Sequence, residues 1–138
     1  MITCFSCQKS EQLSKDAVAK EELDLRHFSN IPEEVNGCSC YLSASNKEFQ
    51  AKEYLYVDNL TSVGYVHIGN NIRRLKVVKL KNHEPSTYKV LKDSLYTVII
   101  DLSQTSELDE TWQQKGQMTV TSKDGNTTTK QIVGECGC

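Results

Sequence analysis

The residues best suited to chemistry are six cysteines, which are gathered at three places in the chain. Two of them, Cys4 and Cys7, lie near the start. The others form two Cys-x-Cys pairs, namely Cys38 with Cys40 and Cys136 with Cys138. Residues 41–135 contain no cysteine. Cysteines placed in this way can form disulfides, bind a metal ion as thiolates or carry a lipid, so each cluster is considered in turn.

The first cluster lies in a segment that resembles the end of a bacterial lipoprotein signal. Residues 1–7 are mainly apolar, a small residue (Ser6) precedes Cys7, and a polar run follows. The resemblance implies that Cys7 carries the lipid, that the protein is anchored in a membrane of the bacterial cell envelope, and that residues 1–7 are the remnant of the signal. A complete signal has an apolar stretch of about 7–15 residues, so this interpretation places Met1 inside a longer signal. The alternative is a short cytosolic N-terminus with two incidental cysteines.

The two Cys-x-Cys pairs predict a disulfide framework. Four cysteines remain after removal of the signal, and an even number in an oxidising compartment is typical of disulfides. Bridges within a pair would close very tight rings, which disulfide geometry disfavours. The two remaining pairings both join the start of the domain to its end. One such bridge closes a loop of about 100 residues and stabilises the fold by about 4–5 kcal/mol, whereas the second adds much less.

Metal binding by the same four cysteines is one alternative, and free thiols are the other. Two cysteine pairs could hold zinc in a tetrahedral site. Zinc sites usually have two or more residues between paired cysteines, and here each pair has one, a spacing that also suits a soft ion such as Cu(I). We expect disulfides, no metal and no cofactor.

The elements that position these cysteines are predicted to be β-strands. Residues 8–36 are expected to form a disordered or partly helical tether, because Ser14–Leu25 has helix-forming composition but only a thin apolar stripe. Residues 37–138 are expected to form the β domain, a small antiparallel barrel or sandwich of about seven strands. The predicted strands are Cys40–Leu42, Glu53–Val57, Val63–Ile68, Ile72–Leu80, Leu95–Leu102, Gln117–Thr121 and Thr127–Val133.

Local signals refine this prediction. Gly69–Asn71 and Asp124–Gly125 are typical of tight hairpin turns. The adjacent Val77 and Val78 break the alternation of their strand and indicate a bulge. Residues 95–102 are the most apolar strand, so we expect both of its faces to be covered. Residues 104–115 are predicted to be a loop or a single helical turn.

Other classes of function are disfavoured. The net charge of −2 gives no sign of nucleic-acid binding, and no apolar run approaches the length of about 18 residues that crosses a bilayer. The histidines His27, His67 and His83 show no metal or nucleophile spacing, and there is no glycine-rich phosphate loop. We therefore expect no enzymatic activity.

The stretch from Tyr54 to Val133 resembles the small periplasmic and membrane-bound inhibitors of c-type lysozyme. Three features carry the resemblance: the strand pair from Val63 to Leu75, the Ser86-Thr87-Tyr88 sequence, and Trp112 shortly before Lys115-Gly116. The resemblance implies an antiparallel β-barrel in which Ser86 and Lys115 contact the partner protein. A lysine is suited to this role, because the cleft of a glycosidase holds two carboxylates.

The sequence as a whole indicates a non-enzymatic, lipid-anchored domain of the cell envelope. Its expected partner is another protein or a cell-surface ligand, and a tether of about 30 residues would let it reach a few nanometres from the membrane. Lysozyme inhibition through Ser86 and Lys115, and metal binding by the paired cysteines, are the two alternatives.

Overall fold

The computed structural model describes residues 22–108 and 111–138. Cys4, Cys7 and the first part of the expected tether lie outside these residues. The described strands are β1 (Leu25–Arg26), β2 (Ser39–Ser43), β3 (Tyr56–Asp58), β4 (Val63–Ile68), β5 (Asn71–His83), β6 (Ser86–Lys92), β7 (Tyr96–Leu108), β8 (Thr111–Ser122) and β9 (Thr127–Gly137). Two short helices accompany them, η1 (Glu33–Val35) and α2 (Asn46–Gln50). Neither helix described here is long and apolar enough to cross a lipid bilayer.

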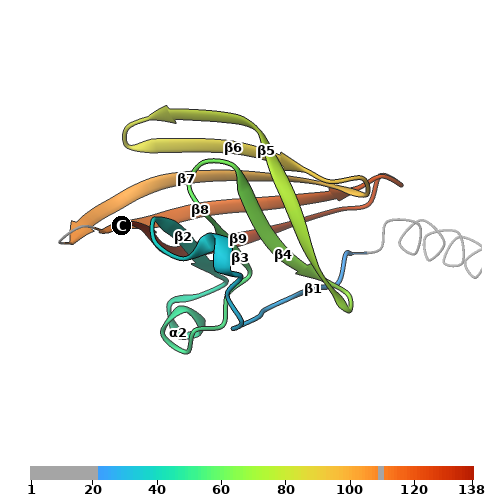
Figure 1. The fold of residues 1–138 in the computed structure, drawn as a ribbon, viewed down its shortest axis with the longest axis horizontal. Helices are drawn as coiled ribbons and strands as arrows, with labels where there is room; N and C mark the ends of the chain where they lie inside the picture. The colour runs from blue at the N-terminus through green and yellow to red at the C-terminus, as the bar shows by residue number, and fades with distance from the viewer. Residues whose placement is uncertain (1–21, 109–110) are drawn as a thin grey trace, which may run out of the picture.

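The strands form an antiparallel barrel (Figure 1). They follow the order β4-β3-β2-β9-β8-β7-β6-β5, and β5 pairs again with β4 to close the barrel. The short strand β1 pairs with the end of β4 that β3 does not reach. The mainly-β prediction is therefore confirmed, with eight strands in the barrel and one beside it. Closure satisfies the backbone groups that an open sheet would leave at its edges.

The β7–β8 hairpin extends further than the sequence indicated. Strand β7 reaches Leu108 and β8 begins at Thr111, so the expectation of a loop or helical turn over residues 104–115 is wrong for residues 104–108 and 111–115. A register shift between Gln104 and Ser106 interrupts this hairpin. The polar residues there give no alternating pattern, because this part of the hairpin extends beyond the apolar core. In Figure 1 the end of β7 and the turn between β5 and β6 lie at the same end of the barrel.

The barrel interior is filled by the inward-facing side chains of each strand. In β7, Val98, Ile100 and Leu102 are buried, whereas Asp101 is exposed and Ile99 is half-buried. The expectation that this strand is covered on both faces is therefore wrong. Each strand of a barrel packs one face on the core and has its other face on the outside, so only every second residue is fully buried.

The turns and the bulge agree with the sequence-based expectations. Gly69 joins β4 to β5 and Gly125 joins β8 to β9, each with a positive φ (+60° and +95°) that favours glycine. The register of the β5–β6 pair shifts between Val77 and Lys79, which confirms the bulge predicted from the adjacent valines.

The segment before residue 37 packs against the outside of the barrel. Phe28 and Val35 are buried with the outward-facing Val57 and Val63 of β3 and β4. The expectation that all of residues 8–36 form a tether is therefore wrong for residues 23–36. Apolar side chains in this segment are irregularly spaced because it covers a sheet face as extended chain, so no helical or strand period reveals them.

A polar contact fixes the same segment to β4 and β5. The carboxylate of Glu34 accepts hydrogen bonds from Tyr65 Oη and from Arg74 Nε, the latter at 2.5 Å. These hydrogen bonds, first the one from Arg74, lower the pKa of Glu34 to about 2. This covering segment, residues 23–36, is thus held on the barrel by apolar burial and by the Glu34–Arg74 ion pair.

Candidate functional site

The four cysteines of the β domain form two disulfides. Cys40 on β2 lies directly opposite Cys136 on β9, and the antiparallel register places Cys38 opposite Cys138. The bonds are Cys38–Cys138 and Cys40–Cys136, with sequence separations of 100 and 96. The disulfide prediction is confirmed, and the strand register determines which of the two end-to-end pairings forms. Disulfides persist in oxidising compartments, so these two indicate a location outside the cytoplasm.

The Cys40–Cys136 bond, called the inner disulfide below, belongs to a row of inward-facing side chains. Asp58 on β3 pairs with Cys40, Cys40 pairs with Cys136, and Cys136 pairs with Trp112 on β8. Directly opposite residues in an antiparallel sheet have Cβ atoms about 4.5–5.5 Å apart and point to the same face. Four neighbouring strands thus bring a carboxylate, a disulfide and the single tryptophan of the chain into one line.

A buried lysine reaches this row from the opposite wall. Lys89 on β6 is 2% exposed, and its Nζ forms an ion pair with the carboxylate of Asp58, which is 1% exposed. The same carboxylate accepts hydrogen bonds from Tyr56 Oη at 2.6 Å and from the backbone N–H of Leu60 at 2.9 Å. Burial, together with the charge of Asp58, raises the pKa of Tyr56 well above its usual value. Both charges are compensated by each other and by these hydrogen bonds.

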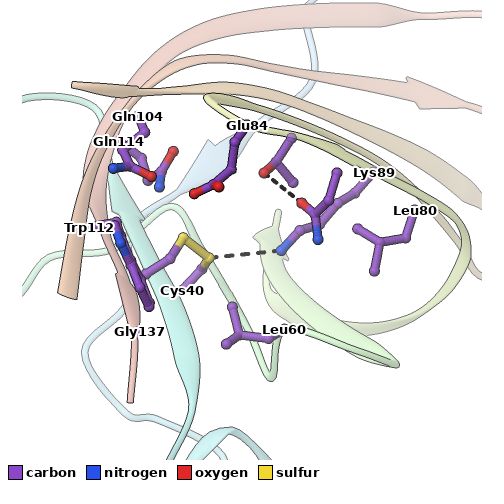
Figure 2. Close-up of a pocket in the computed structure, with 12 residues that line it drawn as sticks. Cys40, Leu60, Leu80, Glu84, Lys89, Gln104, Trp112, Gln114 and Gly137 are labelled. Carbon is purple, nitrogen blue, oxygen red and sulfur yellow. Dashed lines mark hydrogen bonds between the residues drawn. A yellow bond between two sulfur atoms is a disulfide. The ribbon is translucent and has the colours of Figure 1, made fainter. Parts of the chain in front are cut away.

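Lys89 also lies beside the disulfide. Its Nζ is 3.8 Å from Cys40 Sγ. Figure 2 shows the ammonium group pointing toward that sulfur, with Trp112 near the disulfide on its other side. The disulfide is therefore flanked by a positive charge and an aromatic ring.

A cavity of about 320 Å³ opens in front of these groups (Figure 2). It lies at the end of the barrel where the β5–β6 and β7–β8 hairpins extend beyond the core. Apolar walls come from Leu60, Leu80 and Trp112, and polar side chains include Asn82 and Gln104. Small-ligand sites have this character, with mainly apolar walls and a few polar groups that orient the ligand.

Gln114 supplies the clearest sign that the cavity receives a molecule. Its side chain lines the cavity and is 9% exposed, and Oε1 is buried with no hydrogen-bond partner among the described residues. Buried polar atoms in folded proteins nearly always have a partner, since losing one costs about 1–3 kcal/mol. Gln114 Oε1 is thus an acceptor in the cavity wall that the described residues leave unpaired.

The two predicted protein contacts lie elsewhere. Ser86 on β6 pairs with Ser103 on β7, and Ser103 pairs with Lys115 on β8. All three residues are exposed and point to the outer face of the barrel. Two strand spacings separate Ser86 from Lys115, which is about 10 Å. The structure therefore brings the two residues into one row on the outer surface, away from the cavity.

The sequence did not single out Lys89, Asp58 or Gln114. In β6, Thr87, Lys89 and Leu91 alternate with outward-facing residues and point into the barrel. A lysine at one of these inward positions was the sequence signal that could have indicated a buried ion pair. Asp58 follows a predicted strand directly and is of a residue type that is common in turns. Its pairing with Lys89 depends on barrel closure, which no local pattern specifies.

The metal alternative requires chemistry that this oxidised form does not offer. All four cysteines of the β domain are bonded to each other, whereas metal binding uses thiolates. Within residues 22–108 and 111–138, no three His, Cys, Asp or Glu side chains are grouped for a metal ion.

Comparisons with known proteins bring no further assignment. Searches against family models, curated proteins and solved structures found no match to this chain. The function is therefore inferred from the cavity and from the surface of the barrel.

Proposed function

We propose that this protein is a non-enzymatic binding domain of the bacterial cell envelope, which holds a small ligand in the cavity of its barrel. The observation that carries the proposal is the buried, unpartnered Oε1 of Gln114 in the cavity wall. The charged side chains inside the barrel support binding over catalysis. Asp58 and Lys89 are occupied with each other, so neither is offered as a free base or acid.

The lining indicates the chemistry of the ligand. Gln114 Oε1 would accept a hydrogen bond from an O–H or N–H group of the ligand. Trp112, Leu60 and Leu80 would pack against an apolar face of the ligand. Glu84, an exposed residue at the cavity, forms no ion pair within the described part of the chain. The ligand is therefore a small molecule that is uncharged or positively charged, with an apolar face and at least one hydrogen-bond donor.

Two features support the proposed location in the envelope. The disulfides require an oxidising compartment. In this proposal Cys7 carries a lipid and the residues after it tether the barrel to the membrane, as the lipoprotein-like segment indicates.

The ligand proposal is tested with a glutamine substitution and a matched control. Gln114→Leu removes the inner acceptor, and Gln117→Leu makes the same change on the exposed, outer face of the same strand. After incubation with the fraction below 1 kDa of an envelope extract, native mass spectrometry should detect a small molecule on the wild type and on Gln117→Leu. We expect retention by Gln114→Leu to fall about tenfold, because a lost hydrogen bond of this kind costs about 1–3 kcal/mol. Equal retention by both variants would place the ligand outside the cavity.

Lysozyme inhibition is a second candidate, favoured by the outer row that contains Ser86 and Lys115. We expect micromolar protein to slow a c-type lysozyme and Lys115→Ala to abolish the effect, since the lysine would face the two carboxylates of the cleft. Lys47→Ala, at an exposed lysine of α2, is the matched control and should inhibit like the wild type. Absence of inhibition by the wild type would remove this candidate and leave the cavity proposal unaffected.

A further inference from the structure

The two disulfides have different surroundings although their cysteines are only two residues apart in the sequence at each end. Cys38 and Cys138 are exposed at the surface. Cys40 and Cys136 face inward and line the cavity. A small molecule inside the cavity therefore meets the second disulfide, whose chemistry is set by the cavity wall.

The two sulfur-bearing residues of the inner disulfide are not equivalent. As whole residues, Cys136 is 9% exposed and Cys40 is 1% exposed, so Cys136 is the less covered of the two. On the far side, Lys89 Nζ lies 3.8 Å from Cys40 Sγ. A neighbouring ammonium group stabilises a thiolate, and thiol–disulfide exchange is faster when the leaving sulfur is the more stable thiolate. Access thus favours attack at Cys136, and the Lys89 ammonium group, although paired with Asp58, lies close enough to Cys40 Sγ to favour departure of Cys40.

We propose that Cys40–Cys136 is a thiol–disulfide exchange site for small thiols that enter the cavity. The thiolate of the small molecule attacks Cys136 Sγ and forms a new S–S bond, while the Cys40–Cys136 bond breaks and its electron pair leaves on Cys40 Sγ. A second small thiolate then attacks the mixed disulfide and releases Cys136 as a thiol. In total, two small thiols are oxidised to one disulfide, and the protein gains two electrons and two protons. A small disulfide reverses both steps.

The fold is suited to such a cycle because the chain stays joined when the inner bond opens. Cys38–Cys138 continues to link the ends of the same two strands, and β2 is paired with β9 over its whole length, from Ser39 to Ser43. The ion pair between Lys89 and Asp58 keeps the ammonium group in place. The oxidised and reduced forms therefore share one barrel.

The first test uses the full-length protein with the amino acid cysteine as the small thiol. Trp112 reports the reaction, since a disulfide quenches a neighbouring indole and Trp112 pairs with Cys136. We expect a fluorescence increase whose rate rises in proportion to the cysteine concentration. Acid quenching and peptide mass mapping should find the mixed disulfide on Cys136. An adduct on Cys40, or a rate independent of cysteine concentration that matches global unfolding, would overturn the proposal.

The second test asks whether the charge of Lys89 drives the reaction. Lys89→Met leaves the carboxylate of Asp58 unpaired, so the folded control is Lys89→Met combined with Asp58→Asn. We expect this double variant to react about tenfold more slowly than the wild type, because its leaving thiol lacks the neighbouring cation. Lys89→Arg keeps the charge and should retain most of the rate. A double variant that is folded by circular dichroism and reacts at the wild-type rate would overturn the proposal, whatever ligand the cavity binds.

Discussion

Replacing Lys89 with methionine is expected to lower the free energy of unfolding by about 3–5 kcal/mol, because the substitution leaves a buried carboxylate without its counterion. Asp58 is 1% exposed and would keep only its hydrogen bonds from Tyr56 and Leu60. Urea denaturation followed by circular dichroism measures the change. Lys92→Met removes a lysine at the exposed end of the same strand and should shift the stability by less than about 0.5 kcal/mol.

The loss should be largely reversed when both charges are removed. The amide of Asp58→Asn can still accept from the Leu60 N–H and hydrogen-bond to Tyr56, so Lys89→Met with Asp58→Asn leaves no unpaired charge. Replacing both members of a buried ion pair is often neutral, whereas removing one partner is strongly destabilising. A double variant as unstable as Lys89→Met alone would mean that packing of the lysine stem, and not charge compensation, is what the barrel requires.

The second large effect concerns the disulfides, whose contributions should depend on each other. They close loops over sequence separations of 100 and 96, which nearly coincide. Loss of the exposed Cys38–Cys138 bond, by Cys38→Ser with Cys138→Ser, should therefore cost only about 2 kcal/mol while the inner bond remains. Loss of the inner bond from that variant should cost about 4–5 kcal/mol more, because the whole loop is then released.

This dependence is measured by a double-mutant cycle. The inner bond is removed by Cys40→Ala with Cys136→Ala, in the wild type and in the variant without Cys38–Cys138, and each protein is unfolded in urea without reductant. We expect the inner bond to contribute at least about 2 kcal/mol more when it is the sole remaining bridge. Equal contributions in the two backgrounds would show that loop closure is not what these bonds supply.

Much of the covalent framework and fold class could be predicted from the sequence. The spacing of the cysteines led to end-to-end disulfides, and the turn residues at Gly69 and Gly125 led to two of the hairpins. These signals are local, since they depend on ring geometry or on a positive φ. The choice between the two end-to-end pairings needed the register of β2 with β9, which is a long-range property.

The cavity could not be predicted, because its parts meet only when the barrel closes. Asp58 and Lys89 lie 31 positions apart, on strands that are not neighbours in the sheet. Gln114 lies in a stretch expected to be a loop, since its polar neighbours show no alternation. The covering segment with Phe28 and Val35 was likewise hidden, because extended chain on a sheet face has no period of its own.

The outer disulfide also determines how the barrel would respond to mechanical force. Cys38 and Cys138 are joined covalently, and everything between them, including the whole eight-stranded barrel, lies inside that closed loop. A pull applied to the chain before Cys38 and at Cys138 would pass through the S–S bond and leave the hydrogen-bonded strands unloaded. Only the covering segment, held by Phe28, Val35 and the Glu34–Arg74 ion pair, could be peeled away and lengthen under tension. The cavity would keep its shape under tension while the covering segment, which precedes the barrel in the chain, was extended.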